Sequence, residues 1–430
     1  METPTKQNQL KSLAEKIMIM KVPSYGNSIF YALGFLGLTC FAILTVSGLI
    51  MVFMGSAWWL SNPAGIFFRS IHLWAAQAFI LIVILHALVV FSASSFKPPR
   101  RLTWVLGAIV FFFLLIEAEF GYYLRGDFSS QYRALQGADF WNGAYLGHLV
   151  NTLNNAEVFG IHVVLIPIII FALLILHYLL IKLRGIAAPY KSGVKYKMVA
   201  ANHKLLFLRG GALTVLVIIL AAIFPSPLVQ PANIQKVAQD NPSLLAKTLV
   251  SEYNRDSDTA TYFDSIDPYK FDTRQIYVIK PYENYILDIG GQVPGQLPPL
   301  QNMVNTLTIM AKTGLYEKAL DNLNPSAKPT YALRFLSDTG VMDDEAQTMH
   351  ITTDQWGMLR EENGAIPPGA WWLAPLGVLD HTILANDNNG DRDGAIILGL
   401  LMMLVVVFPY IPYLNRIPEK LHLAEFLWKA

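Results

Sequence analysis

The chain contains 430 residues, of which 53% are hydrophobic and 15% are charged, and its mean hydropathy is +0.39. This composition is typical of an integral membrane protein with a sizeable extramembrane part. The formal net charge of +1 identifies no partner by itself, and we expect no nucleic acid partner. The one cysteine, Cys40, excludes a disulfide framework, an iron–sulfur site or a thiolate zinc site within this chain.

Residues 1–27 lack the apolar core of a signal peptide, and we interpret them as a basic amphipathic segment on the membrane surface. Six later segments are each apolar and long enough to cross a bilayer. They span roughly residues 28–54, 66–95, 103–124, 157–183, 205–225 and 394–415. The predicted fold class is therefore an all-α integral membrane protein with an extramembrane insertion between the fifth and sixth segments.

Lysine and arginine residues indicate the orientation of these segments. They cluster before the first segment, between the second and third, between the fourth and fifth, and after the sixth. Because positive residues favour the cytoplasmic side, both termini are predicted to be cytoplasmic and the insertion to lie outside. We expect the chain to reside, as a multi-pass protein, in a bacterial or archaeal cytoplasmic membrane.

Two of the apolar segments each contain two histidines. His72 and His86 lie 14 residues apart in the second segment, and His162 and His177 lie 15 residues apart in the fourth. At about 100° per residue, either spacing returns to nearly the same face of a helix, about 21 Å further along its axis. Ionisable residues inside a bilayer are costly and usually functional. Two such helices side by side offer two pairs of imidazoles, each suited to one haem iron.

Glycines recur with the same period in the first and third segments. Gly34 and Gly48 are 14 residues apart, as are Gly107 and Gly121. Glycine allows a bulky partner to approach a helix backbone closely, so we expect flat haem faces to press on these positions. The pattern predicts a four-helix bundle that holds two non-covalent b-type haems, plus two further membrane helices.

The residues around these positions resemble cytochrome b of the quinol-oxidising cytochrome bc and bf complexes, with the closest likeness to the bf type. The segments that carry this resemblance in the first four helices are NSIFYALGFLGLTCF, RSIHLWAAQAFILIVILH, FKPPRRLTWVLGA, GYYL and LHYLLIKLRGIAAP. Further along, IFPSPLVQPAN, PPGAWWLAPL and GAIILGLLMMLVVVFPYIP resemble subunit IV of the bf complexes. Arg69 matches an arginine that precedes the first haem histidine in that family.

The resemblance implies two bis-histidine haems in series across the membrane, with quinone sites near each surface. It also implies a Rieske iron–sulfur protein, a cytochrome c-type subunit, membrane lipid and a homodimeric complex as partners. The quinol site on the outer side is implied near Asp127, Ala370, Trp371, Trp372 and Pro375.

The chain departs from the family at that outer site. The family motif Pro-Glu-Trp-Tyr stands here as Gly369, Ala370, Trp371 and Trp372, so the glutamate that takes a proton from quinol is replaced by alanine. Glu361 and Glu362 are candidate substitutes. After GYYL, the usual Pro-Trp is replaced by Arg125 and Gly126.

The predicted organisation combines these observations. The parts are an amphipathic segment at 1–27, a diheme four-helix bundle at 28–200, a fifth membrane helix at 201–232, an insertion at 233–364, and a quinol-site-like motif with the sixth helix and tail at 365–430. Within the insertion, 297–323 has helical periodicity, 273–291 has strand-like composition and 351–364 is typical of a capped helix, which predicts a small mixed α+β domain. This domain either covers a partner's docking surface or stabilises the complex.

We therefore expect a redox subunit of a quinol:cytochrome c oxidoreductase-type complex, which carries electrons between quinone sites in a respiratory chain. Loss of the glutamate leaves a second hypothesis open, a non-bifurcating diheme electron wire between the quinone pool and an external redox partner. A third hypothesis, a membrane scaffold or transporter without redox function, requires four depth-matched histidines to arise by coincidence.

Overall fold

The computed structural model describes residues 18–186, 197–254, 298–323, 328–349, 351–352, 368–387 and 390–427. The chain separates into two compact units that alternate along the sequence. Unit 1 comprises Met1–Glu117, Ile166–Ser226 and Gly399–Ala430, and unit 2 comprises Ala118–Leu165 and Pro227–Leu398. Three of the four boundaries fall inside long membrane spans, which therefore contribute residues to both units, and the fourth lies after α9 (His203–Ile223).

Six helices among the described residues are long and apolar enough to cross a membrane. They are Ile29–Met54, Pro63–Ser92, Arg101–Tyr123, Asn155–Arg184, His203–Ile223 and Arg392–Tyr410. The prediction of an all-α integral membrane protein with six crossing helices is confirmed. The sixth span ends several residues earlier than expected, because Pro409 and Pro412 each remove a backbone donor that a continuing helix needs.

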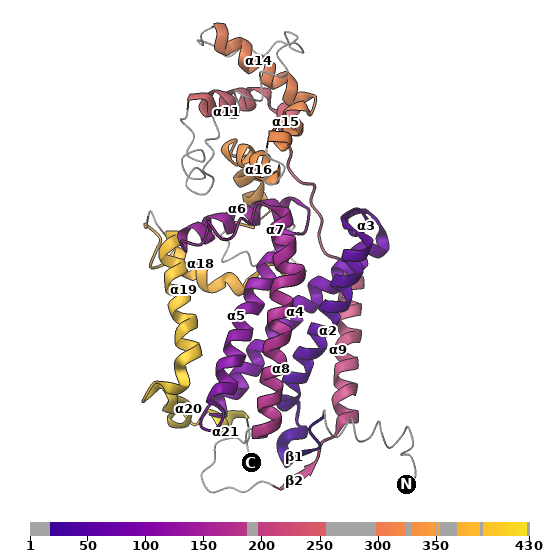
Figure 1. Cartoon of the computed structure of the whole chain (residues 1–430), viewed down its shortest axis with the longest axis vertical. Helices are drawn as coiled ribbons and strands as arrows, with labels where there is room; N and C mark the ends of the chain where they lie inside the picture. The colour runs from indigo at the N-terminus through magenta and orange to yellow at the C-terminus, as the bar shows by residue number, and fades with distance from the viewer. Residues whose placement is uncertain are drawn as a thin grey trace, which may run out of the picture. The chain divides into compact units, whose positions relative to one another are not determined.

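Unit 1 is built around three long helices that pack on one another, namely α2 (Ile29–Met54), α4 (Pro63–Ser92) and α9 (His203–Ile223) (Figure 1). The short helix α3 (Ser56–Ser61) connects α2 to α4, and the side chain of Asn62 caps the N-terminus of α4. Gly210 of α9 lies against Phe35 and Thr39 of α2, where a larger side chain would not fit. A small residue at this contact therefore permits the close approach of the two helices.

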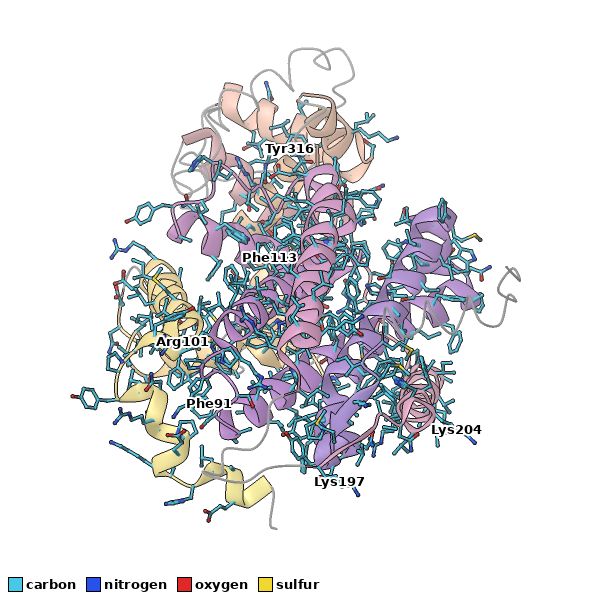
Figure 2. All side chains as sticks on the ribbon, turned by 60° about the horizontal axis from the view of Figure 1, so that its bottom comes forward. Phe91, Arg101, Phe113, Lys197, Lys204 and Tyr316 are labelled. Atoms are coloured by element: carbon cyan, nitrogen blue, oxygen red, sulfur yellow. The ribbon has the colours of Figure 1, made fainter. Side chains whose placement is uncertain are left out.

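One end of unit 1 carries a two-stranded antiparallel sheet made of β1 (Lys21–Pro23) and β2 (Met198–Ala200). Its register pairs Lys21 with Ala200 and Pro23 with Met198. The Arg209 guanidinium donates hydrogen bonds to the carbonyls of Asn27 and Ser28, which ties the start of α2 to α9. Figure 2 shows Lys197 and Lys204 beside this sheet, in one of the lysine- and arginine-rich segments that the sequence indicated.

The helix α5 (Arg101–Tyr123) starts in unit 1 and ends in unit 2. Near its start, the Trp104 indole donates to the Val405 carbonyl of α19 (Gly390–Val407) at 2.7 Å. The aromatic rings of Phe91, Phe96 and Phe408 gather around Trp104, and Lys97 pairs with Glu419. These contacts hold the start of α5 against the last membrane helix.

The fourth membrane span contains an irregular turn. It runs as α7 (Asn155–Gly160), a π-helical turn at Ile161–Leu165 and α8 (Ile166–Arg184). A π-helical turn accommodates one extra residue. The 15-residue spacing from His162 to His177 in this span therefore advances about as far around the helix as the 14-residue spacing from His72 to His86.

Unit 2 contains α6 (Phe128–Gly143), α7 and the helices of the insertion. These are α10 (Ile234–Asp240), α11 (Pro242–Asn254), α14 (Pro298–Lys312), α15 (Leu315–Leu323), α16 (Lys328–Asp338) and α17 (Val341–Thr348). The core includes Tyr316, which packs edge-on against Phe335 at a centroid distance of 5.3 Å and lies among these helices in Figure 2. Helices α16 and α17 pack against α6.

The helical periodicity at 297–323 is confirmed by α14 and α15, which are separated at Gly314, where φ is +76°. All elements in the described part of the insertion are helices. The strand-like segment at 273–291 and nearly all of the capped helix expected at 351–364 lie outside the described residues. The mixed α+β insertion therefore stays a prediction.

Candidate functional site

Four glycines of the membrane helices each lie against the ring of one histidine. Gly34 and Gly48 of α2 meet histidines of α4, and Gly107 and Gly121 of α5 meet histidines of the fourth span. The distance from the position that a Cβ would take to the histidine Cε1 is 3.5 Å for Gly34–His86, 3.2 Å for Gly48–His72, 3.1 Å for Gly107–His177 and 2.9 Å for Gly121–His162. Three pairs belong to unit 1, and Gly121–His162 belongs to unit 2.

The edge of an imidazole lies against each of these glycines. The expectation that haem faces press on the same positions stays a prediction. A glycine at these positions leaves the space that the neighbouring ring occupies. Each imidazole is held at a fixed helix level, and a neutral imidazole can supply a nitrogen ligand to a metal.

One hydrogen bond indicates the tautomer of His72. Ser47 Oγ lies 2.9 Å from His72 Nδ1, and the same hydroxyl donates to the Ile43 carbonyl at 2.7 Å. Since the hydroxyl proton is used for Ile43, Ser47 Oγ accepts the proton of Nδ1, so Nε2 is the unprotonated ring nitrogen. Such a bond fixes the ring orientation of a metal-binding histidine. Sequence reasoning missed Ser47, although it directly precedes Gly48.

Arg69, predicted from the family motif, is a buried residue of α4, three residues before His72. Its guanidinium lies over the Trp59 ring at 6.0 Å from the centroid. A buried guanidinium is a strong partner for a carboxylate group. The cofactor-binding role that the family resemblance implies for Arg69 stays a prediction.

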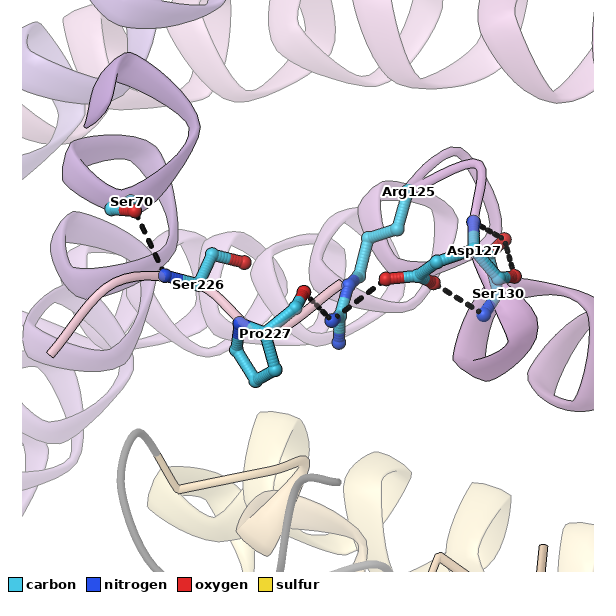
Figure 3. A network of polar contacts seen from close by, with 6 residues as sticks. All are labelled: Ser70, Arg125, Asp127, Ser130, Ser226 and Pro227. Atoms are coloured by element: carbon cyan, nitrogen blue, oxygen red, sulfur yellow. Dashed lines mark hydrogen bonds and ion pairs between the residues drawn. The ribbon is translucent and has the colours of Figure 1, made fainter. Parts of the chain in front are cut away.

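The turn after α5 contains a buried ion pair in unit 2. Arg125 donates to Asp127 at 3.0 Å and to the Pro227 carbonyl at 2.9 Å (Figure 3). Asp127 also caps α6, because its carboxylate accepts the backbone N–H of Ser130 at 3.0 Å. Gly126 between them has a φ of +73°, a conformation that favours glycine. The Arg-Gly-Asp sequence therefore builds the turn where the family has Pro-Trp.

In unit 1, a second contact fixes the residue that precedes Pro227. The Ser70 hydroxyl of α4 accepts the backbone N–H of Ser226 at 2.8 Å, as Figure 3 also shows. The Trp74 indole donates to the Phe224 carbonyl at 2.9 Å. These two bonds hold the chain as it leaves α9.

A second ion pair of unit 2 involves the Gly-Ala-Trp-Trp motif at residues 369–372, which belongs to the predicted outer quinol site. The Glu119 carboxylate of α5 accepts two bonds from Arg133 of α6, at 2.8 and 2.6 Å, and one from the Trp372 indole at 2.8 Å. Trp372 also packs edge-on against Tyr122 at 5.7 Å, and the Arg133 guanidinium lies 4.1 Å from the Tyr122 ring centroid. The end of α5 thus meets the motif directly.

The structure brings together some of the predicted outer-site residues. Trp371 and Trp372 form a short 3-10 turn whose rings contact each other, and Pro375 follows in α18 (Ala374–His381). Ala370 and Asp127 are fully buried, and Asp127 is engaged by Arg125 and Ser130. Glu361 and Glu362 lie outside the described residues. Sequence reasoning missed Glu119 and Arg133, although a glutamate within an apolar segment is itself a signal.

Six membrane helices and four histidines seated against glycines are the features of a membrane-embedded b-type cytochrome. Residues 77–231 match the family model of cytochrome b(N-terminal)/b6/petB. Cytochrome b6 of Heliobacterium modesticaldum is 32% identical over 199 residues, which cover 41% of this chain and 93% of that protein. Cytochrome b6 of a Synechocystis strain is 30% identical over 203 residues, covering 42% of this chain and 91% of that protein.

The chain therefore belongs to the cytochrome b/b6 family, whose members bind b-type haem. A solved chain of a hyperthermophilic respiratory complex III is 17% identical, with a TM-score of 0.46 and coverage of 96% of this chain and 98% of that one.

Proposed function

We propose that the chain is the diheme cytochrome b subunit of a quinol-oxidising bc-type complex that serves electron transport in a respiratory chain. The observation that carries this proposal is the set of four glycine–histidine contacts, two on α4 and two on the fourth span. His72 and His162 are assigned to one haem, and His86 and His177 to the other. Bound haem supplies reversible one-electron chemistry.

The chain's own residues hold and orient these cofactors. Ser47 keeps His72 in the tautomer that offers Nε2, and Arg69 is assigned to a haem propionate. The glycines of α2 and α5 admit the imidazole rings. A rise of about 1.5 Å per residue separates the two histidine levels by about 21 Å, which is consistent with one haem near each membrane surface.

The outer quinol site is assigned to the end of α5 and to the Ala370–Pro375 stretch. Aromatic rings and a carboxylate meet there, because Trp372 contacts Tyr122 and Glu119. Flat aromatic surfaces with a few placed polar groups are typical of a site for a quinone ring. Asp127 supports this region through its cap on α6.

The assignment of sides and partners rests on the sequence pattern and on the family. We assign both termini to the cytoplasmic side and the insertion to the outside, following the lysine and arginine distribution. A Rieske iron–sulfur protein and a cytochrome c-type subunit are the proposed acceptors on the outer side, in a homodimeric complex.

Stopped-flow mixing of the purified complex with menadiol, with the inner quinone site blocked by an inhibitor, tests this function. The expected result is a rise of b-haem absorbance together with reduction of the Rieske partner. If dithionite reduces the haems but menadiol and duroquinol do not, quinol oxidation at the outer site is excluded, and the non-bifurcating electron wire replaces the proposed function.

A further inference from the structure

Glu119 is an acidic residue inside a membrane helix, and two donors fix its position. Arg133 and the Trp372 indole together make three hydrogen bonds to its carboxylate. The two donors come from α6 and from the motif before α18, which are far apart in the sequence but lie in the same unit. Charged side chains within a membrane span are costly and mark functional positions.

The carboxylate is more accessible than the groups that hold it. The Glu119 side chain is 19% exposed, whereas the Arg133 side chain is 3% exposed and Trp372 is 7% exposed. A carboxylate has about four lone-pair positions, of which these bonds use three. One position therefore remains for an external hydroxyl. Asp127, by contrast, is fully buried and is engaged by Arg125 and Ser130.

The Trp372 indole that donates to this carboxylate belongs to a cluster of aromatic rings. Trp372 contacts the rings of Tyr122 and Trp371, at centroid distances of 5.7 and 6.1 Å. An aromatic wall next to a hydrogen-bond acceptor suits a flat ring that carries a hydroxyl group. A quinol has both features.

The helix geometry separates this carboxylate from the histidine. Glu119 and Gly121 are two residues apart on α5, so their side-chain directions differ by about 200°. Gly121 meets His162. The Glu119 side chain consequently projects from the side of α5 opposite to the histidine contact, so Glu119 is not a candidate haem ligand.

We propose that Glu119 is a catalytic residue that accepts the proton of a bound quinol, in place of the acid that Ala370 cannot provide. This inference rests on the proposed quinol-oxidising function. In the step, a quinol O–H bond breaks, the proton binds to the Glu119 carboxylate, and a quinolate anion remains. Loss of two electrons and of the second proton, which water takes, leaves a quinone; the proposed iron–sulfur partner and a bound b haem would each accept one of these electrons. Protonated Glu119 releases its proton to water on its exposed side.

The test measures the initial rate of b-haem reduction by menadiol and by duroquinol in the intact complex, from about pH 4, near the ordinary pKa of a glutamate, to about pH 9. Charged and titratable groups near Glu119 include Arg133 of α6 and Tyr123 of α5, and Tyr122 packs against Arg133 and Trp372. The wild-type rate is expected to fall on the acid side, because only the ionised form of a base accepts the quinol proton. Glu119→Gln is expected to lower the rate about 100-fold and to remove this acid limb.

Removing Glu119 alone leaves the buried Arg133 without its carboxylate, so the double variant Glu119→Gln, Arg133→Gln separates structure from chemistry. If the ion pair is only structural, the double variant regains wild-type rates, and the proposal is overturned. If Glu119 accepts the proton, the double variant stays slow, while Arg133→Gln alone keeps an acid limb. Glu117→Gln, a matched change on the same helix, is expected to keep the wild-type rate and profile.

The two proposals fail in different ways. A wild-type rate in Glu119→Gln overturns the role of Glu119 and leaves quinol oxidation intact. If dithionite reduces the wild-type haems but quinols do not, both the proposed function and this inference are overturned. The dithionite-reduced haem spectrum is expected to be the same in all these variants, because Glu119 does not contact the histidines.

Discussion

The four glycine–histidine contacts and the two buried ion pairs of unit 2 use different physical means to build a site. At the glycine–histidine contacts, the decisive property is the absence of a side chain, because each glycine leaves room for an imidazole edge. At the ion pairs, the decisive property is charge compensation. Arg125 pairs with Asp127 and Arg133 pairs with Glu119, and all four side chains are poorly exposed. Substitutions that add volume should therefore affect haem binding, whereas substitutions that remove charge should affect the stability of unit 2.

The largest effect on stability is expected at the Arg125–Asp127 pair. Arg125→Gln leaves the fully buried Asp127 without its cation, which typically costs about 3–5 kcal/mol. A clear drop in the melting temperature of the complex, followed by differential scanning fluorimetry, checks this. The double variant Arg125→Gln, Asp127→Asn removes both charges and should recover part of the loss. An unchanged melting temperature in Arg125→Gln would show that the pair contributes little.

Alanine at the four glycines should reduce haem occupancy in a defined order. The added Cβ would lie 2.9 Å from His162 at Gly121, 3.1 Å from His177 at Gly107, 3.2 Å from His72 at Gly48 and 3.5 Å from His86 at Gly34. Overpacking costs about 1–3 kcal/mol, so Gly121→Ala should lose most haem and Gly34→Ala least.

Haem content per chain, measured by the pyridine haemochrome method, gives this order directly. Gly211→Ala is the matched control, because a Cβ on this glycine of α9 meets nothing within 4 Å. Equal occupancy in all four variants would contradict the steric role of the glycines.

Ser47→Ala should have a smaller effect, confined to one haem. The bond from His72 Nδ1 to Ser47 increases the electron donation of the ring, which favours oxidised iron. Its loss, at about 0.5–1.5 kcal/mol, should raise that haem's midpoint potential by about 20–60 mV. Redox titration measures this shift. Thr45→Ala removes a hydroxyl of α2 that bonds only to the Phe41 carbonyl among the described contacts, and it should leave both potentials unchanged.

The smallest effect is expected at Asp343, in the first turn of α17. Partial burial, reinforced by the neighbouring Asp344, raises the pKa of Asp343 in the folded state. Protonation therefore favours the folded insertion, and this contribution is lost as the pH rises through the raised pKa. Asp343→Asn should make the melting temperature slightly less dependent on pH between about 4 and 7, the range above the ordinary pKa of an aspartate. An identical pH dependence in wild type and variant would contradict the assignment.

The membrane helices were predictable because their signals repeat. Hydrophobic length defined six spans, and the 14- and 15-residue periods pointed to the glycines and histidines that the structure brings into contact. The π-helical turn at Ile161–Leu165 was not predicted, since a one-residue difference in spacing has several structural explanations.

The outer site was less predictable because its contacts join distant segments. Glu119 and Trp372 are separated by 253 positions, and no local pattern pairs them. Arg125 and Pro227 are likewise far apart in the sequence, and their contact lies next to the turn at Gly126. The sequence motifs pointed to Ala370 and Asp127, which are both buried. They did not point to Glu119, whose carboxylate is more accessible.

The most direct test of the central claim, that four histidines hold two haems, is the haem content of the purified complex in wild type and in His86→Ala. The account predicts two b-type haems per chain in wild type and one in His86→Ala. His203→Ala, at the start of α9, should keep both haems. One haem per chain in wild type, or two haems in His86→Ala, would contradict the assignment of the histidine pairs.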